Sequence, residues 1–171
     1  MPHTVKFKGN DKTLAGTEIK VGDKAPTFKT LNGSLGIVTL AETPAKARMF
    51  SVVPSLDTPV CSMQSKKFEE GLAKLGDKVA AYTVSLDMPF AQKRFCSAEN
   101  ITNMQTLSDV HDGSFGLAFG VLLEGLPLKL LARSVFVTDA AGTVTYVEYV
   151  PEVTSEPNYE AAMAALAKAA G

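Results

Sequence analysis

Residues 49–61 read Met49-Phe50-Ser51-Val52-Val53-Pro54-Ser55-Leu56-Asp57-Thr58-Pro59-Val60-Cys61, and this stretch decides the fold. Its first five residues are a short apolar run that Pro54 stops, which predicts a buried strand over Met49–Val53. After Cys61 the apolar residues repeat at helical spacing, which predicts a helix over residues 60–75 with Gly76 as its C-cap. A strand therefore leads through a proline turn into a helix, and Cys61 lies in the first turn of that helix.

This position favours the thiolate form of a cysteine. The first N–H groups of a helix have no backbone acceptors, and the positive end of the helix dipole attracts negative charge. Thr58 stands three residues before Cys61, where we expect its hydroxyl to reach the sulfur, and Pro54 fixes the loop that aims both. A cysteine beside an apolar stripe is otherwise an inert core residue, and the first-turn position argues against that alternative.

A second buried strand is predicted over Lys78–Leu86. One helix joins it to the first strand, so the two form a right-handed βαβ unit and run parallel. Asp87 is expected to cap a short helix that has Pro89 in its first turn and carries Cys96. Both cysteines then follow the carboxyl ends of adjacent strands, which is the edge where open α/β sheets place their sites.

Cys96 and Arg133 each allow two interpretations. Phe95 beside Cys96 is consistent with a packed, unreactive cysteine. Lys93 and Arg94 just before it favour a reactive thiol instead, because nearby positive charge lowers a thiol pKa. Arg133 opens an otherwise apolar segment, where an arginine is commonly exposed or ion-paired, since an unpaired buried guanidinium is unfavourable.

The remaining predicted elements surround this unit. They are an N-terminal hairpin of Thr4–Phe7 and Thr17–Val21, a second pair of Ala25–Phe28 and Leu31–Leu40 around Asn32-Gly33, a short helix over Ser114–Phe119, a hairpin of Ala132–Thr138 and Val144–Val150, and a final helix over Ser155–Ala170 with Pro157 in its first turn. This order predicts one α/β domain over residues 1–171.

Composition narrows the range of functions. The chain has 171 residues, of which 46% are hydrophobic and 20% charged, and its formal net charge of -1 gives no reason to expect nucleic acid or an anionic membrane as a partner. No apolar run approaches the roughly 20 residues of a spanning helix, and the N-terminus has no signal-peptide pattern, so we expect a cytoplasmic protein. The spacing of the two cysteines and the scattered His3 and His111 exclude common zinc patterns, and no metal is expected.

The pattern Pro54-x-x-x-Thr58-x-x-Cys61 resembles the active-site signature of the peroxiredoxins, and the residues around it look like the thiol peroxidase branch of that family. Other segments resemble the family as well: Val21–Phe28 its opening segment, Asp87–Cys96 the second-cysteine helix of the branch, and Gly125–Leu128 with Ala132–Val137 its arginine strand. Together these segments extend over nearly the whole chain.

The resemblance implies a thioredoxin-like fold with an N-terminal β-hairpin, and a peroxidase that needs no cofactor. It implies that Cys61 is the peroxidatic cysteine, that Cys96 is the resolving cysteine of an intramolecular disulfide, and that Pro54, Thr58 and Arg133 complete the site. The partners it implies are a hydroperoxide substrate, thioredoxin as the reductant, and a second copy of the chain in a homodimer.

Two other functions stay open at this stage. A thiol–disulfide oxidoreductase of the same fold needs a second thiol at position 64, where this chain has Gln64. A redox sensor would be oxidised once and signal through a partner protein, whereas a peroxidase cycles.

Cys96 lies about two turns into its predicted helix, so we expect the sulfurs to be apart in the reduced protein and the helix to unwind when the disulfide forms. Glu69, Glu70 and His111 are interpreted as structural or solvated.

Overall fold

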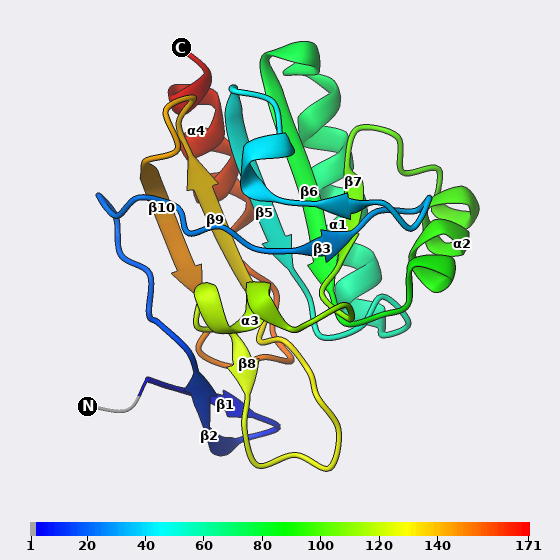
Figure 1. The fold of residues 1–171 in the computed structure, drawn as a ribbon, viewed down its shortest axis with the longest axis vertical. Coiled ribbons are helices and arrows are strands. Elements are labelled where there is room, and N and C mark those ends of the chain that lie inside the picture. Colours follow the sequence, from blue (N-terminus) through cyan, green and yellow to red (C-terminus); the bar gives the residue numbers. More distant parts are fainter. Residues whose placement is uncertain (1–2) are drawn as a thin grey trace.

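A seven-stranded sheet forms the centre of residues 3–171, which are the residues that the computed structural model describes. Its strand order is β10-β9-β5-β6-β7-β3-β4, and a three-stranded sheet of β1, β2 and β8 lies beside it (Figure 1). The strands are β1 (Thr4–Phe7), β2 (Asn10–Ala15), β3 (Thr30–Leu31), β4 (Ile37–Val38), β5 (Ala47–Val52), β6 (Val79–Ser85), β7 (Gln105–Ser108), β8 (Leu122–Leu123), β9 (Ser134–Thr138) and β10 (Val144–Tyr149).

Strand β5 lies inside this sheet and pairs with a neighbour along each edge. It runs parallel to β6, with Met49 opposite Ala81, and antiparallel to β9, with Val52 opposite Ser134. Every residue of β5 is buried, as expected for a strand covered on both faces. The predicted strand over Met49–Val53 and its parallel partner are confirmed, although β5 begins two residues earlier and ends one residue earlier than predicted.

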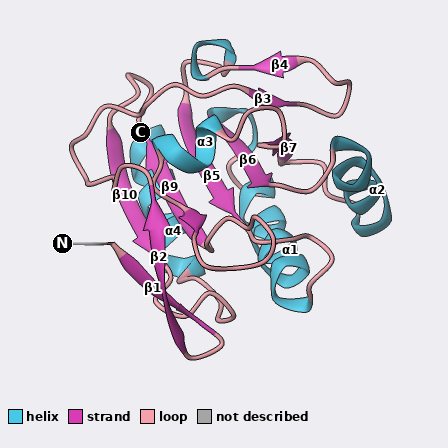
Figure 2. Ribbon diagram, turned by 60° about the horizontal axis from the view of Figure 1, so that its bottom comes forward, coloured by secondary structure: helices cyan, strands magenta, loops and turns pink. Residues whose placement is uncertain are grey.

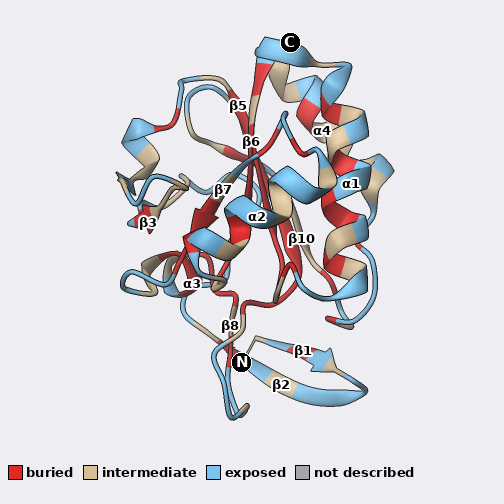
Figure 3. Cartoon of the chain, turned by 90° about the vertical axis from the view of Figure 1, so that its right-hand side faces the viewer, coloured by how far each residue is buried: buried red, intermediate tan, exposed pale blue. Residues whose placement is uncertain are grey.

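Helices cover both faces of the sheet. Within the described residues they are α1 (Pro59–Ala73), α2 (Pro89–Glu99), α3 (Ser114–Ala118) and α4 (Tyr159–Ala170), with single 3-10 turns η1 (Leu40–Glu42) and η2 (Gly76–Lys78). Figure 3 shows α1 and α4 on one side of the buried strands and α3 on the other. Phe68 and Leu166 belong to the apolar core on the α1 and α4 side. On the α3 side Phe50 packs with Phe115 and Phe119, whose rings are stacked 4.2 Å apart.

The N-terminal hairpin is confirmed, but its second strand is not the predicted one. β1 pairs antiparallel with β2 through a two-residue turn at Lys8 and Gly9 (Figure 2). Their φ angles of 51° and 81° are both positive, as the tight hairpin turns with the correct twist require. The predicted strand over Thr17–Val21 is wrong, because the chain leaves the hairpin at Gly16, where φ is 98°.

Of the second predicted pair of strands, the turn around Asn32 is confirmed and the strand over Ala25–Phe28 is wrong. β3 and β4 pair antiparallel around Asn32, whose side-chain oxygen accepts hydrogen bonds from the backbone N–H groups of Ser34 and Gly36. Ala25–Phe28 is not a strand, because Phe28 turns into the aromatic core against Phe50 and Phe115. Aromatic burial thus outweighs local strand propensity here.

Other predicted elements are confirmed with shifted ends. The β9–β10 hairpin and α3 lie where predicted. α1 ends at Ala73, and Gly76 opens η2 with a φ of 56°, so Gly76 is not the C-cap of α1. α4 begins at Tyr159 instead of Ser155, because the side chain of Asn158 caps it by accepting from the N–H of Ala161. Pro157 consequently precedes the helix.

The segment after the hairpin is held against α3. The N–H of Thr17 donates to the carbonyl of Leu117 at 3.0 Å, and a Cβ added at Gly16 would overlap that same carbonyl group. Gly22 has an almost identical φ of 97°, and a Cβ there would meet open space. The two glycines therefore have the same φ, but only Gly16 lies in close contact with another part of the backbone. Within residues 3–171, none of the helices is long and apolar enough to cross a bilayer.

We predict that Gly16→Ala destabilises the protein much more than Gly22→Ala. Both variants place an alanine at positive φ, which costs about 1–2 kcal/mol, but only Gly16→Ala also drives a methyl group into a carbonyl. Urea unfolding of both variants measures the difference. Equal losses of unfolding free energy would show that the contact between Gly16 and α3 is not tight in solution.

Candidate active site

Cys61 lies where the chain passes from β5 into α1. β5 ends at Val52, residues 53–58 form a loop, and α1 begins at Pro59, so Cys61 is in the first helical turn, as predicted. Its side chain is completely buried and packs with Val53 and Leu56. Because α1 begins at Pro59, the sulfur of Cys61 lies near the positive end of the helix dipole.

Thr58 occupies the N-cap position of α1. Its backbone is extended, and its carbonyl accepts the N–H of Ser62 at 3.1 Å. Its hydroxyl donates to the carbonyl of Ser55 at 2.9 Å. The structure therefore shows this hydroxyl bonded within the loop, while its action on the sulfur of Cys61 stays a prediction.

Arg133 lies immediately before β9, and the strand register brings it to the loop. Val52 pairs with Ser134, so Arg133 lies beside the point where the chain leaves β5. The side chain is only 2% exposed, and the alternative of a surface arginine is wrong. Its Nε donates to the carbonyl of Val153 at 2.7 Å, and its Nη1 donates to Oε1 of Gln64 at 2.9 Å. Both acceptors are neutral, so they leave the positive charge of the guanidinium uncompensated.

Gln64 is a site residue that the sequence interpretation missed. It is buried on α1, one turn after Cys61, and its Nε2 donates to Oγ of Ser51 at 2.7 Å. Its other end accepts from Arg133, so Gln64 joins the helix, the central strand and the guanidinium. A polar residue one turn beyond Cys61 on a buried helix face was the available signal, because buried amides are found where they have partners.

A cavity of about 410 Å³ opens beside this arrangement. Its walls come from the hairpin, the 53–58 loop, the start of α1, the segment before β9 and the segment after β10. They are formed by Phe7, Lys8, Pro54, Ser55, Thr58, Pro59, Val60, Leu128, Leu130, Arg133, Val153 and Thr154. Pro54, Thr58 and Arg133 thus line one cavity, most of whose other walls are apolar, and Cys61 is not among its lining residues.

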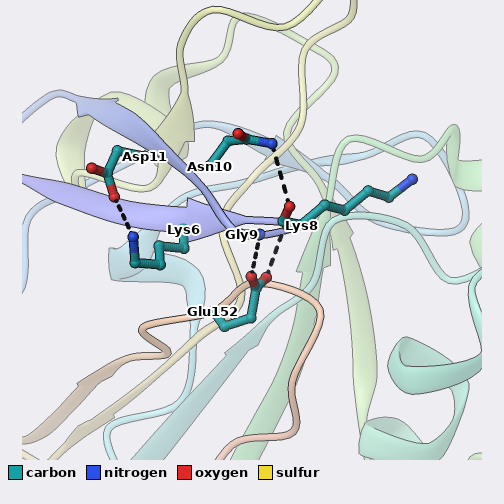
Figure 4. A network of polar contacts seen from close by, with 6 residues as sticks. All are labelled: Lys6, Lys8, Gly9, Asn10, Asp11 and Glu152. Atoms are coloured by element: carbon teal, nitrogen blue, oxygen red, sulfur yellow. Dashed lines mark hydrogen bonds and ion pairs between the residues drawn. The ribbon is translucent and has the colours of Figure 1, made fainter.

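Glu152 holds the hairpin in its place at this cavity. Its carboxylate accepts from the N–H groups of Gly9 at 2.7 Å and Lys8 at 3.2 Å (Figure 4). It also accepts from the N–H of Thr154 at 3.0 Å. These hydrogen bonds, led by that from Thr154, lower the pKa of Glu152 to about 2. Lys8 and Thr154 both line the cavity, so one carboxylate connects two of its walls.

Cys96 lies on α2 in a different environment from the predicted one. Burial and the nearby carboxylate of Glu69 raise its pKa. The prediction that Lys93 and Arg94 lower this pKa is wrong, because both side chains are exposed while Cys96 is half-buried on the α1 side of the helix. Glu69 itself accepts from the N–H groups of Thr102 and Asn103, which makes it a structural residue as predicted.

The two cysteines belong to separate apolar clusters, and both are free thiols. Phe95 packs against the cluster of Cys61 and also against the cluster that includes Cys96. A second cavity of about 380 Å³ lies between the start of α1 and α2, with Thr58, Phe95 and Arg94 among its walls. The helix that carries Cys96 is thus packed over the site without bringing the second sulfur into it.

Asp87 does not cap α2 as predicted. The N-cap of α2 is Met88, and the Asp87 carboxylate accepts instead from the N–H of Leu56 at 2.8 Å and from Oγ of Ser55 at 3.0 Å. The physical reason is that the fold brings two donors of the 53–58 loop to Asp87, although the loop is far from Asp87 in the sequence. Within the part of the chain that the structure describes, no group of three or more His, Cys, Asp or Glu side chains is placed to hold a metal ion.

Comparison with known proteins adds the family. The Redoxin family matches residues 20–163. The chain belongs to the redoxin family. It is 54% identical over 165 residues to the thiol peroxidase of Listeria monocytogenes serotype 4b (strain F2365), covering 96% of this chain and 98% of that one. It is 53% identical over 156 residues to the thiol peroxidase of Bacillus subtilis (strain 168), covering 91% and 92%. Within the redoxins, the chain thus falls in the thiol peroxidase branch.

Solved structures of redoxins agree with the fold. A peroxiredoxin-like protein from Aquifex aeolicus superposes with a TM-score of 0.90 at 42% identity, over 97% of this chain and 96% of that one. The thiol peroxidase from Chromobacterium violaceum superposes with a TM-score of 0.86 at 17% identity, over 98% of both chains, which supports the fold alone. The predicted thioredoxin-like fold is confirmed, and this redoxin is a thiol-dependent peroxidase.

We predict that part of the stability of this redoxin is lost on acidification through Glu152. Its pKa is about 2 when folded and about 4.5 ordinarily, so its contribution is complete above about pH 4.5 and is lost as the pH falls toward 2. Urea unfolding at pH 5 and pH 3 should show a smaller pH dependence for Glu152→Gln than for the parent. Glu160→Gln, an exposed change on α4, is the matched control and should keep the parent slope. An unchanged slope in Glu152→Gln would contradict the assignment.

Proposed function

We propose that Cys61 is the peroxidatic cysteine, that Cys96 is the resolving cysteine, and that the enzyme is of the intramolecular two-cysteine type. The observation that carries this proposal is the placement of Cys61 in the first turn of α1, one residue after Val60, which lines the same cavity as the buried Arg133. A positive charge whose hydrogen-bond partners are neutral favours an anion nearby, and the thiolate of Cys61 is the anion that the chemistry requires.

In the first step the Cys61 thiolate attacks the distal oxygen of the hydroperoxide. A sulfur–oxygen bond forms, the oxygen–oxygen bond breaks, and the leaving oxygen takes a proton and departs as water or an alcohol. The sulfur is oxidised to a sulfenic acid and the peroxide is reduced. The apolar walls around Leu128, Leu130 and Val153 suit the organic part of an alkyl hydroperoxide as well as hydrogen peroxide.

Arg133 and Thr58 act on the charges of this step. The Arg133 guanidinium favours the thiolate and the negative charge that develops on the leaving oxygen. Thr58 lies at the helix start with its hydroxyl bonded to Ser55, so it aligns the loop and presents its oxygen to the cavity. Pro54 lines the same cavity and limits the conformations of the loop.

In the second step the Cys96 sulfur attacks the sulfenic acid, a disulfide forms, and water is released. While α2 is packed, burial and Glu69 keep the Cys96 thiol protonated. Unwinding of α2 removes the thiol from both influences and carries it toward Cys61. Cys61 therefore reacts with peroxide while α2 is packed, and Cys96 reacts with the sulfenic acid when α2 is unwound.

A thioredoxin-type dithiol is the proposed reductant, because a disulfide between two cysteines of one chain is returned to thiols by exchange with another dithiol. We also propose a homodimer. Large apolar side chains are exposed at the start of α2 and on α3, with exposed fractions of 63% for Phe90, 51% for Met88 and 47% for Leu117. Sedimentation of the purified chain would test this assembly.

The two alternative functions are not favoured. A thiol–disulfide oxidoreductase would need a cysteine where Gln64 stands, and Gln64 is occupied with Arg133 and Ser51. A sensor that is oxidised only once does not match the thiol peroxidases to which the chain is similar over most of its length.

We predict that Cys61→Ser abolishes peroxide reduction and that Cys96→Ser allows one turnover without cycling. A serine hydroxyl is too weakly acidic to supply the nucleophile, whereas loss of Cys96 removes only the resolving step. Peroxide consumption coupled to thioredoxin, thioredoxin reductase and NADPH measures cycling, and one equivalent of peroxide measures the single turnover. Normal cycling by Cys96→Ser would exclude it as the resolving cysteine.

We predict that Arg133→Met and Thr58→Val slow the first step, with the larger loss, about a hundredfold or more, in Arg133→Met. Each variant removes a group that acts on the thiolate or the leaving oxygen, and Arg133→Met also leaves the Gln64 oxygen without its donor. Stopped-flow oxidation of Cys61 in a Cys96→Ser background gives the rate constant. Lys93→Met, on the exposed side of α2, is the matched control. Rates equal to the parent in both site variants would place the two residues outside the mechanism.

We predict that hydrogen exchange rises in α2 when the disulfide forms. Both cysteines are free thiols and pack in separate clusters, so we expect α2 to give up its packing when their sulfurs join. Mass-spectrometric exchange of the reduced and oxidised proteins should show faster exchange over residues 89–99 and little change in α4. Unchanged exchange in α2 on oxidation would mean that the disulfide forms on an intact helix.

A further inference from the structure

Asp87 lies between the two redox-active segments and is hydrogen-bonded to both. It follows β6 and precedes α2 by two residues. Its Oδ1 accepts from Oγ of Ser55, and its Oδ2 accepts from the N–H of Leu56 and from Oγ of Ser85, at 3.0, 2.8 and 2.8 Å. Hydrogen bonds to a carboxylate are about twice as strong as those between neutral groups, so this is a strong anchor.

On one side, the anchor reaches the groups around Cys61. Ser55 and Leu56 belong to the 53–58 loop, and the Ser55 carbonyl accepts the hydroxyl of Thr58 at 2.9 Å. Leu56 packs directly with Cys61. Asp87 is therefore hydrogen-bonded directly to Leu56, the apolar contact of the peroxidatic sulfur, and is linked through Ser55 to Thr58, the N-cap of α1.

On the other side, the anchor reaches α2. Oγ of Ser85, which donates to Asp87, accepts from Nε2 of Gln92 at 3.0 Å. Gln92 is fully buried on α2 and also donates to the carbonyl of Leu107 at 3.1 Å. The backbone carbonyl of Asp87 accepts from Oγ of Ser108. The packed position of the Cys96 helix and the shape of the peroxidatic loop thus depend on the same carboxylate.

We propose that Asp87 is a positioning residue that couples the two steps of the reaction: it holds the 53–58 loop ready for peroxide while α2 is packed, and unwinding of α2 loosens the loop. This coupling rests on the proposed roles of Cys61 and Cys96. Its consequence is that the loop is aligned for peroxide only when Cys96 is docked and its thiol protonated, so oxidation and resolution do not compete.

The test uses the Cys96→Ser protein, in which only the first step occurs. Asp87→Asn has the same size but no charge, so its contacts to the loop lose their charge assistance, and its amide N–H₂ replaces one of the two oxygens that accept from Ser55 and Leu56. We expect its rate with hydrogen peroxide to fall about tenfold, while alkylation of Cys61 by iodoacetamide changes less than about threefold, because alkylation needs the thiolate but not an aligned loop.

Two companion variants sharpen the result. Gln92→Leu removes the buried hydrogen bonds that tie α2 to Ser85 and Leu107, so it should lower the first-step rate less than Asp87→Asn does and, with Cys96 present, accelerate disulfide formation. Ser55→Ala removes one bond to Asp87 and should lower the peroxide rate less than Asp87→Asn does. Added to Asp87→Asn, it should cause little further loss, because the two groups act through one contact.

The outcomes separate the inference from the proposed function. A peroxide rate for Asp87→Asn within about twofold of the parent overturns the positioning role, and so does an equal fall in peroxide and alkylation rates. If Asp87→Asn does not fold, a full parent rate in Ser55→Ala overturns it instead. Failure of the Cys96→Ser parent to consume one equivalent of peroxide would contradict the role of Cys61 itself.

Discussion

The burial of β5 is the constraint on which the site depends. This strand has a neighbouring strand on each edge and apolar core on both faces. It ends just before Pro54, which has no N–H for further pairing. The same register that buries the strand pairs Val52 with Ser134 and so brings Arg133 to the start of the loop. The 53–58 loop, the first turn of α1 and Arg133 therefore lie together at the carboxyl end of β5.

Charge is distributed unevenly over this site, and the distribution follows from packing. Arg133 is buried against the neutral oxygens of Gln64 and Val153, so its charge acts on the cavity. Cys96 is half-buried near the carboxylate of Glu69, which favours its neutral form. The two cysteines thus lie in different surroundings, Cys61 in the first turn of α1 and Cys96 beside the carboxylate of Glu69. The fold thus gives two chemically identical side chains different environments.

Segments far from the cysteines complete the cavity. Glu152, in the segment after β10, holds the turn of the N-terminal hairpin through hydrogen bonds (Figure 4). The same segment supplies the carbonyl of Val153, which accepts from Arg133. A network of hydrogen bonds around Asp87 joins the 53–58 loop to α2 in a similar way. Carboxylates at two borders of the site therefore keep separate segments in one arrangement.

The sequence by itself determined the strand, the proline turn and the helix that presents Cys61, the α/β class, the second helix with Cys96, and the peroxidase chemistry that its motifs resemble. These follow from periodicity, proline and helix ends, which act over a few neighbouring residues. It did not determine that Thr17–Val21 is irregular, that Gln64 holds Arg133, or that Asp87 binds the loop instead of capping α2. Nor did it determine that burial and Glu69 raise the pKa of Cys96. Only the tertiary structure decided these features, because each depends on a contact between residues far apart in the chain, and neither spacing nor propensity records such contacts.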